Sequence, residues 1–393
     1  MIARFDQIRK FAARLTALLA MTWLAACDVP TIGGGGGGPA IDPTKPVQVA
    51  LLVPGGSGQA TDSLLARDLE NAARLASKDL QGASIDLRIY NTAGNPQQAA
   101  TVTRQAIADG AKIILGPLYS EAAVASGVAA ANDQVNVLSF SNTPTIAGGN
   151  VFVMGSLFQS SADRLVRYAR AQGVQRYYIA RANDLQGELG AAAAAQAVTA
   201  AGGQVVGTHA YPLSQQDVIL ASSTIADQAR AAGAQAIILT ANVGPELAIL
   251  GTKLPEAGID TAATRLIGLT RWNSVPEMLD VPGLQGGYFA LPDTGRKAAF
   301  DQRFKAAYGQ DPHPLAGLAY DGVAAIGALA ATGDRNALSR SFLTRSSGFQ
   351  GTNGIFRFMP NGLNQRGLAV ATIENGRTRV LSPAPSAFSN ALY

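Results

Sequence analysis

The side chains best suited to chemistry in this sequence are one cysteine, two histidines and several hydroxyl groups in glycine-containing loops. Cys27 is the only cysteine, which excludes an intrachain disulfide and a cysteine-based metal site. His209 and His313 lie far apart without the spacing of metal ligands, so we expect no metal and no cofactor. A serine nucleophile would need a partner histidine, and the glycines of residues 55–58 lack the order of a phosphate-binding loop. We therefore expect that the protein is not an enzyme.

Three polar loops each follow an apolar run that is typical of a strand, at residues 54–59, 117–120 and 141–143. In open sheets of parallel strands, loops of this kind lie at one edge and bind ligands. The candidate residues for a ligand cleft in these loops are Ser57, Tyr119, Ser120, Ser141, Asn142 and Thr143. Ser120 has a second interpretation, because a serine at the start of a helix often caps that helix without any ligand.

The N-terminal residues have the pattern of a secretory signal. Basic residues precede an apolar run at 15–26, which is too short to span a membrane comfortably. The run ends in the tetrapeptide LAAC, which resembles the bacterial lipobox. That resemblance implies a signal peptide at 1–26, cleavage before Cys27 and lipidation of this residue. The alternative is a simple cleaved signal followed by an incidental cysteine.

A tether is predicted for residues 27–46, because they contain six consecutive glycines at 33–38 and several prolines. We therefore expect a lipid-anchored protein on the periplasmic side of the cell envelope, with membrane contact only through the lipid. The outer membrane is slightly favoured over the inner membrane, although Asp28 resembles a signal for retention in the inner membrane.

Composition places the rest of the chain among folded proteins with a sizeable core. The 393 residues are 47% hydrophobic and 15% charged. The formal net charge is +4, and residues 1–26 contribute +3 of it because four basic residues there outnumber one acidic residue. The remaining chain is nearly neutral, which excludes the strongly basic face of a nucleic-acid-binding protein.

From residue 47 onward, strand and helix patterns alternate, which predicts an α/β fold with parallel sheets covered by helices. The first round predicts strands at 47–53, 85–90, 112–115 and 135–140, separated by helices at 61–80, 96–109 and 120–132. The second round predicts strands at 151–154, 177–180, 204–211, 236–239 and 265–269, with helices at 161–172, 185–201, 221–232 and 246–256. The last part predicts strands at 288–290, 354–359, 368–374 and 377–381, and helices at 294–308, 315–331 and 336–343.

Several stretches resemble, in order, the Leu/Ile/Val-binding family of periplasmic binding proteins. They are VALLVPGGSG (49–58), KIILGPLYS (112–120), VLSFSNTP (137–144), FKAAYGQDPHPLAGLAYDGVAAIGALA (304–330) and GTNGIFRFMPNG (351–362). The resemblance implies two Rossmann-like lobes joined by a three-strand hinge, with crossings near 141–151, 269–287 and 343–351. It divides a body at 47–381 into lobe one (about 47–145 and 290–345) and lobe two (about 150–287 and 350–381), followed by a tail at 382–393.

The resemblance also implies how a ligand would be held. Ser120 and Thr143 match positions that hold the ligand carboxylate in the amino-acid receptors of this family. Those receptors present a carboxylate from lobe two to the ligand ammonium, whereas Thr270 and Arg271 stand at the comparable strand end here. The next residue, Trp272, is a possible contact for a protein partner, or else it folds back to plug the hinge.

Two functions remain open at this point. The turn GPL at 116–118 and the opening loop resemble the penicillin-binding-protein activators, which implies a non-enzymatic lipoprotein that binds and regulates a penicillin-binding protein in peptidoglycan synthesis. The alternative is a solute-binding receptor of an ABC importer for branched-chain amino acids or related small ligands, with an ABC permease as its partner. In both cases a small ligand could lie between the lobes.

Overall fold

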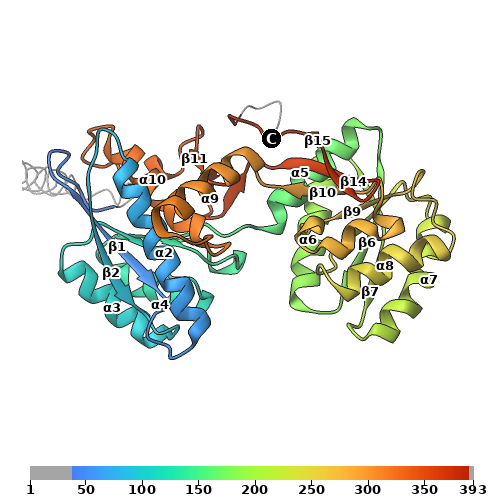
Figure 1. The fold of residues 1–393 in the computed structure, drawn as a ribbon, viewed down its shortest axis with the longest axis horizontal. Helices are drawn as coiled ribbons and strands as arrows, with labels where there is room; N and C mark the ends of the chain where they lie inside the picture. The colour runs from blue at the N-terminus through green and yellow to red at the C-terminus, as the bar shows by residue number, and fades with distance from the viewer. Residues whose placement is uncertain (1–37, 389–393) are drawn as a thin grey trace, which may run out of the picture. The chain divides into compact units, whose positions relative to one another are not determined.

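The first of two α/β lobes is built on a sheet of parallel strands. The computed structural model describes residues 38–388 (Figure 1). The sheet has the order β2-β1-β3-β4-β5, and all of its pairings are parallel. Its strands are β1 (Val47–Val53), β2 (Ile85–Asn91), β3 (Ile113–Leu115), β4 (Asn136–Ser139) and β5 (Val151–Val153). The helices that follow the first three strands are α2 (Ala60–Asp79), α3 (Pro96–Ala108) and α4 (Ser120–Ala130).

Local sequence explains these elements. The run VQVALLV of β1 is apolar because the strand lies between two neighbours, and most of its residues are fully buried. Helix α2 buries Leu65, Leu69 and Ala72 along one stripe, as its spacing predicts. Helix α3 begins with Pro96, and the Asn95 side chain caps it by accepting a hydrogen bond from the Gln98 amide at 2.9 Å.

The second lobe is built on a mixed sheet with the order β15-β14-β10-β9-β8-β6-β7. Its parallel strands are β6 (Arg176–Ala182), β7 (Gln204–Tyr211), β8 (Ala236–Leu239), β9 (Arg265–Gly268) and β10 (Tyr288–Leu291). The antiparallel hairpin β14 (Ala369–Glu374) and β15 (Arg377–Ser382) extends it. Helices α5 (Phe158–Ala171) and α6 (Leu185–Ala200) pack into one hydrophobic cluster, and α7 (Gln215–Ala231) and α8 (Pro245–Glu256) into another.

Late segments of the chain return to the first lobe. Helices α9 (Thr294–Tyr308) and α10 (Ala316–Ala330) pack beside α2, so orange and blue segments lie together in Figure 1. Short helix α11 (Arg340–Leu343) leads to a small antiparallel sheet of β11 (Phe349–Gly351), β12 (Gly354–Phe358) and β13 (Asn364–Arg366). Three phenylalanines of this small sheet, Phe349, Phe356 and Phe358, share the core of the first lobe. The α/β class with parallel sheets is therefore confirmed.

The strand pairings differ from the predicted division into lobes at three places. Strand β5 pairs with β4 in the first sheet, although it was assigned to the start of lobe two. Strand β10 lies wholly in the second sheet, although lobe one was expected to resume at residue 290. Strands β11–β13 pack on the first lobe, whereas residues from 350 onward were assigned to the second. Short apolar strands fit either sheet equally well, so their sequences carry no information about which sheet they join.

The chain consequently crosses between the lobes later than predicted each time. The crossings lie at residues 154–157 between β5 and α5, at 292–293 between β10 and α9, and at 367–368 between β13 and β14. The predicted crossings at 141–151 and 269–287 are therefore wrong by one strand each, and the one at 343–351 is wrong by two strands, β12 and β13. Among residues 38–388, no helix combines the length and apolar character needed to span a membrane. Cys27, the signal peptide and most of the tether lie outside the described residues.

Candidate functional site

The predicted cleft residues of the first lobe come together at the carboxyl ends of β1, β3 and β4, which are neighbours in the sheet. Two of these serines are used in local turns. Ser57 accepts a hydrogen bond from the Gln59 amide at 3.1 Å, and the buried Ser141 accepts one from the Thr143 amide at 3.1 Å. Asn142, between Ser141 and Thr143, is exposed. This edge of the sheet therefore presents amide and hydroxyl groups on a rigid support, as a ligand site requires.

Tyr119 is held in place by the neighbouring helix. Its hydroxyl donates to Asp62 of α2 at 2.5 Å, and the ring lies against Gly94, where a Cβ would come within 3.1 Å of it. The hydrogen bond to Asp62 and partial burial raise the pKa of Tyr119 to about 12, so the phenol is neutral at physiological pH. Ser120 is the first residue of α4, and the capping position before it is Tyr119, whose side chain makes no capping bond. The capping interpretation of Ser120 is therefore wrong.

The second lobe presents the loops that follow β8 and β9. The Thr270 hydroxyl donates to the Ala241 carbonyl at 2.9 Å and so ties these two loops together. Arg271 is exposed, and its Nε donates to Asn273 at 3.1 Å. Two carboxylates near the end of β6 have structural partners: Asp184 caps α6 through the Gly187 amide, and Glu188 lies 3.7 Å from Arg181. Arg271 therefore lies in the loop that follows β9.

Trp272 is not a surface contact. Its side chain is 0% exposed and stacks on Phe289, with ring centroids 5.5 Å apart. Gly268 and Gly287 make room for the indole, because a Cβ at Gly268 would lie 2.0 Å from Nε1 and a Cβ at Gly287 would lie 2.7 Å from Cζ3. The prediction of a partner contact is therefore wrong, and Trp272 fills the core of the second lobe. The two glycines, one at the end of β9 and the other just before the neighbouring strand β10, are the sequence signal that could have revealed this.

A pocket lies beside the hinge, between the two lobes. Its volume is about 480 Å³, and its walls come from α5, α6, the loop after β4 and the turn between β12 and β13. Seven of its lining side chains are carboxamides: Asn142, Gln159, Gln186, Gln196, Asn361, Asn364 and Gln365. We call this pocket the hinge pocket. Of the cleft residues predicted from the sequence, only Asn142 lines it, because the other walls come from three segments with no common motif.

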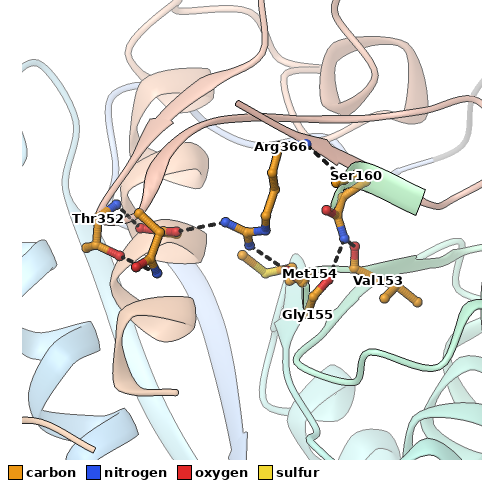
Figure 2. Close-up of polar contacts among 9 residues, drawn as sticks. Val153, Met154, Gly155, Ser160, Thr352 and Arg366 are labelled. Atoms are coloured by element: carbon orange, nitrogen blue, oxygen red, sulfur yellow. Dashed lines mark hydrogen bonds and ion pairs between the residues drawn. The ribbon is translucent and has the colours of Figure 1, made fainter. Parts of the chain in front are cut away.

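Buried polar groups bind the crossings of the hinge to each other (Figure 2). Arg366, just before the third crossing, donates to the Met154 carbonyl of the first crossing at 2.5 Å, and its backbone amide donates to the Ser160 hydroxyl at 3.2 Å. Its guanidinium also lies 3.7 Å from the Asp321 carboxylate of α10. Asp321 in turn accepts a hydrogen bond from the Thr352 amide at 2.6 Å.

The buried carboxylate of Asp321 makes the stability of the protein depend on pH. Burial raises the pKa of Asp321 to about 6, although Arg366 and the Thr352 amide lower it. Because the folded pKa exceeds the unfolded value, this group stabilises the fold fully below about pH 4, and that contribution is lost as the pH rises through 6. We expect urea unfolding to show a loss of roughly 3 kcal/mol between pH 4 and pH 7 that is absent in Asp321→Asn. An identical pH dependence in the two proteins would contradict this.

The chain has clear similarities to known proteins. A family model described as periplasmic binding protein matches residues 46–378. A putative branched-chain amino acid ABC transporter from Rhodospirillum rubrum is 19% identical, with a TM-score of 0.70 over 86% of this chain and 100% of that chain. A branched-chain amino acid ABC transporter periplasmic ligand-binding protein from Burkholderia xenovorans LB400 is also 19% identical, with a TM-score of 0.64 over 86% of this chain and 96% of that chain. At these identities the likeness shows the fold.

Further comparisons agree with this fold. An ABC transporter substrate-binding protein from Desulfitobacterium hafniense, in complex with Leu, is 20% identical and has a TM-score of 0.59 over 86% of this chain and 100% of that chain. Among curated proteins, the uncharacterized protein RP748 of Rickettsia prowazekii (strain Madrid E) is 26% identical over 125 residues. That match spans 32% of this chain and 32% of the relative, about a third of its length.

Proposed function

Since the chain belongs to the periplasmic binding protein family, we propose that it is a non-enzymatic, solute-binding receptor of an ABC importer. Proteins of this family bind small ligands in the periplasm, which places the body of this chain on the periplasmic side of the envelope. We further propose that Cys27 carries a lipid anchor. A permease partner would lie in the inner membrane, so the receptor proposal favours the inner membrane for the lipid anchor. Asp28, which resembles a signal for retention in the inner membrane, agrees with this.

The hinge pocket is the observation that carries this proposal. Residues of both lobes line it, and only short crossings join the lobes, as a receptor that closes on its ligand requires. Solved structures with the same fold include solute-binding proteins in complex with Leu and with benzoate. These observations support binding of a small solute between the lobes.

The other function predicted from the sequence, regulation of a penicillin-binding protein, has less support. It rests on the resemblance of the 116–118 turn and the opening loop, and the structurally similar proteins are named as transporter components. The residue expected to contact such a partner, Trp272, is buried. No feature of residues 38–388 favours this role over that of a receptor, so we do not propose it.

Ligand-dependent stabilisation and closure test the receptor proposal. We expect at least one small solute from a transport-oriented panel to raise the Tm of the body and to reduce its radius of gyration in X-ray scattering. Two results together would contradict the proposal. In the first, no member of a panel of sugars, amino acids and aromatic acids changes the Tm or the radius of gyration. In the second, the protein captures a penicillin-binding protein from detergent extract.

Leucine, isoleucine and valine are expected to bind more weakly than micromolar, that is, with less than about 8 kcal/mol of binding free energy. The loop after β9 offers Thr270 and Arg271 where a carboxylate would be needed for the ammonium, and a buried charge without a partner costs several kcal/mol. Calorimetry measures this directly, and a micromolar Kd for leucine would refute it.

A further inference from the structure

The hinge pocket is lined largely by carboxamides and apolar side chains. A carboxamide carries both hydrogen-bond donors and an acceptor, and some of the seven also have partners within the protein: Gln159 donates to Asp163 at 2.8 Å, and Gln365 accepts from Arg357 at 2.8 Å. Hydroxyl groups also donate and accept, so a carboxamide can pair with a sugar hydroxyl in either direction. Between these amides lie apolar side chains, among them Leu157, Leu189 and Met359, which can cover the C–H face of a sugar ring.

One of these amides lacks a partner for its acceptor. The Asn364 side chain is 4% exposed, and its Nδ2 donates to the carbonyls of Val153 at 2.9 Å and Gly155 at 2.8 Å. Those two bonds fix the orientation of the amide, and its Oδ1 is buried with no hydrogen-bond partner. These two bonds hold the β13 wall of the pocket to the chain around the first crossing of the hinge, so this wall is rigid.

The lining of the pocket contains one acidic and one basic residue. Asp163 of α5 accepts a hydrogen bond from Gln159 at 2.8 Å, and Arg167 is close enough for its charge to lower the pKa of this carboxyl against the larger effect of burial. These two are the charged residues of the lining. A ligand with a single net charge would meet one residue of each sign in this lining, which favours a ligand without net charge.

We propose that the hinge pocket binds a neutral saccharide, whose hydroxyls pair with carboxamides of the lining and whose apolar faces lie on Leu157, Leu189 and Met359. This inference rests on the proposed receptor function and names the chemical class of its solute. It also moves the expected binding site from the strand-end loops of the first lobe to the groove between α5 and α6, near the hinge.

The test uses a side chain that fills the pocket without disturbing the core. Ala192 of α6 is exposed and lines the pocket, so Ala192→Trp should occupy the space of the ligand. Calorimetry and thermal shift would be measured with maltose, N-acetylglucosamine, leucine and benzoate. We expect one of the two saccharides to bind the parent protein and its affinity to fall at least tenfold in Ala192→Trp. The control Ala306→Trp, at an exposed position on α9, should leave that affinity unchanged.

Each other result overturns the inference in a different way. Binding of leucine or benzoate that is lost in Ala192→Trp shows the right pocket and the wrong chemical class. If leucine or benzoate binds the parent protein and still binds Ala192→Trp, the hinge pocket is not the binding site, and the receptor function is still supported. If none of the four probes binds the parent protein, the saccharide inference is wrong, and the wider solute panel described above then decides whether the receptor function fails as well.

Discussion

Replacing Arg366 by methionine is expected to lower the free energy of unfolding at pH 7 by about 3–5 kcal/mol. Asp321 is 0% exposed, and Arg366 supplies the only basic group that forms an ion pair with it among the described residues. Removing the guanidinium leaves the carboxylate buried without a countercharge and takes away the donor to the Met154 carbonyl. Methionine retains an apolar stem against the Phe356 ring, over which the guanidinium lies at 5.3 Å. Urea unfolding followed by circular dichroism measures the loss.

A second variant separates the lost charge pair from lost packing. In the double variant Asp321→Asn with Arg366→Met, no charge remains, and the asparagine oxygen can still accept from the Thr352 amide. We expect the double variant to recover most of the stability lost in Arg366→Met. The single variant should also lose less at pH 5 than at pH 7, because protonation of Asp321 removes the uncompensated charge. A loss below about 1 kcal/mol at pH 7 would show that the pair is not important for the hinge.

The α/β class of the protein could be predicted from the sequence because its signal is local. Helix α2 shows a helical stripe of leucines and alanines, and β1 is a continuous apolar run bounded by proline residues. The strands predicted at 368–374 and 377–381 are present as β14 and β15, and Asn375 and Gly376 between them adopt the positive φ angles that this dipeptide favours. Each of these features depends on residues that are close together along the chain.

The errors all concern partners that are distant in sequence. Strand β5 has the same apolar pattern whichever sheet it joins, so its place in the first sheet could not be read from its own residues. Asp321 belongs to a stretch that resembles the family, but its partner Arg366 lies 45 positions later on a strand of three residues that was not predicted. The hinge pocket shares only Asn142 with the predicted site, because its walls come from segments that are distant in sequence and meet only after folding.

Replacing Trp272 by alanine is expected to lower the free energy of unfolding by about 3–5 kcal/mol. The indole is fully buried, stacks on Phe289 and fills a space opened by Gly268 and Gly287. Two glycines without side chains cannot move inward to fill the cavity, so the loss should lie toward the upper end of that range. Urea unfolding measures it, and a change within about 1 kcal/mol would contradict the assignment of Trp272 to the core.

Phenylalanine at the same position tests what the indole itself contributes. The Trp272 Nε1 group is buried with no hydrogen-bond partner, so the parent protein already bears the cost of an unpaired donor. Trp272→Phe keeps an aromatic ring that can stack on Phe289 and removes that donor, which offsets part of the cost of the smaller volume. We therefore expect Trp272→Phe to lose less than half as much stability as Trp272→Ala. Equal losses in the two variants would show that the fit of the indole between Gly268 and Gly287, rather than stacking, determines the stability of this part of the second lobe.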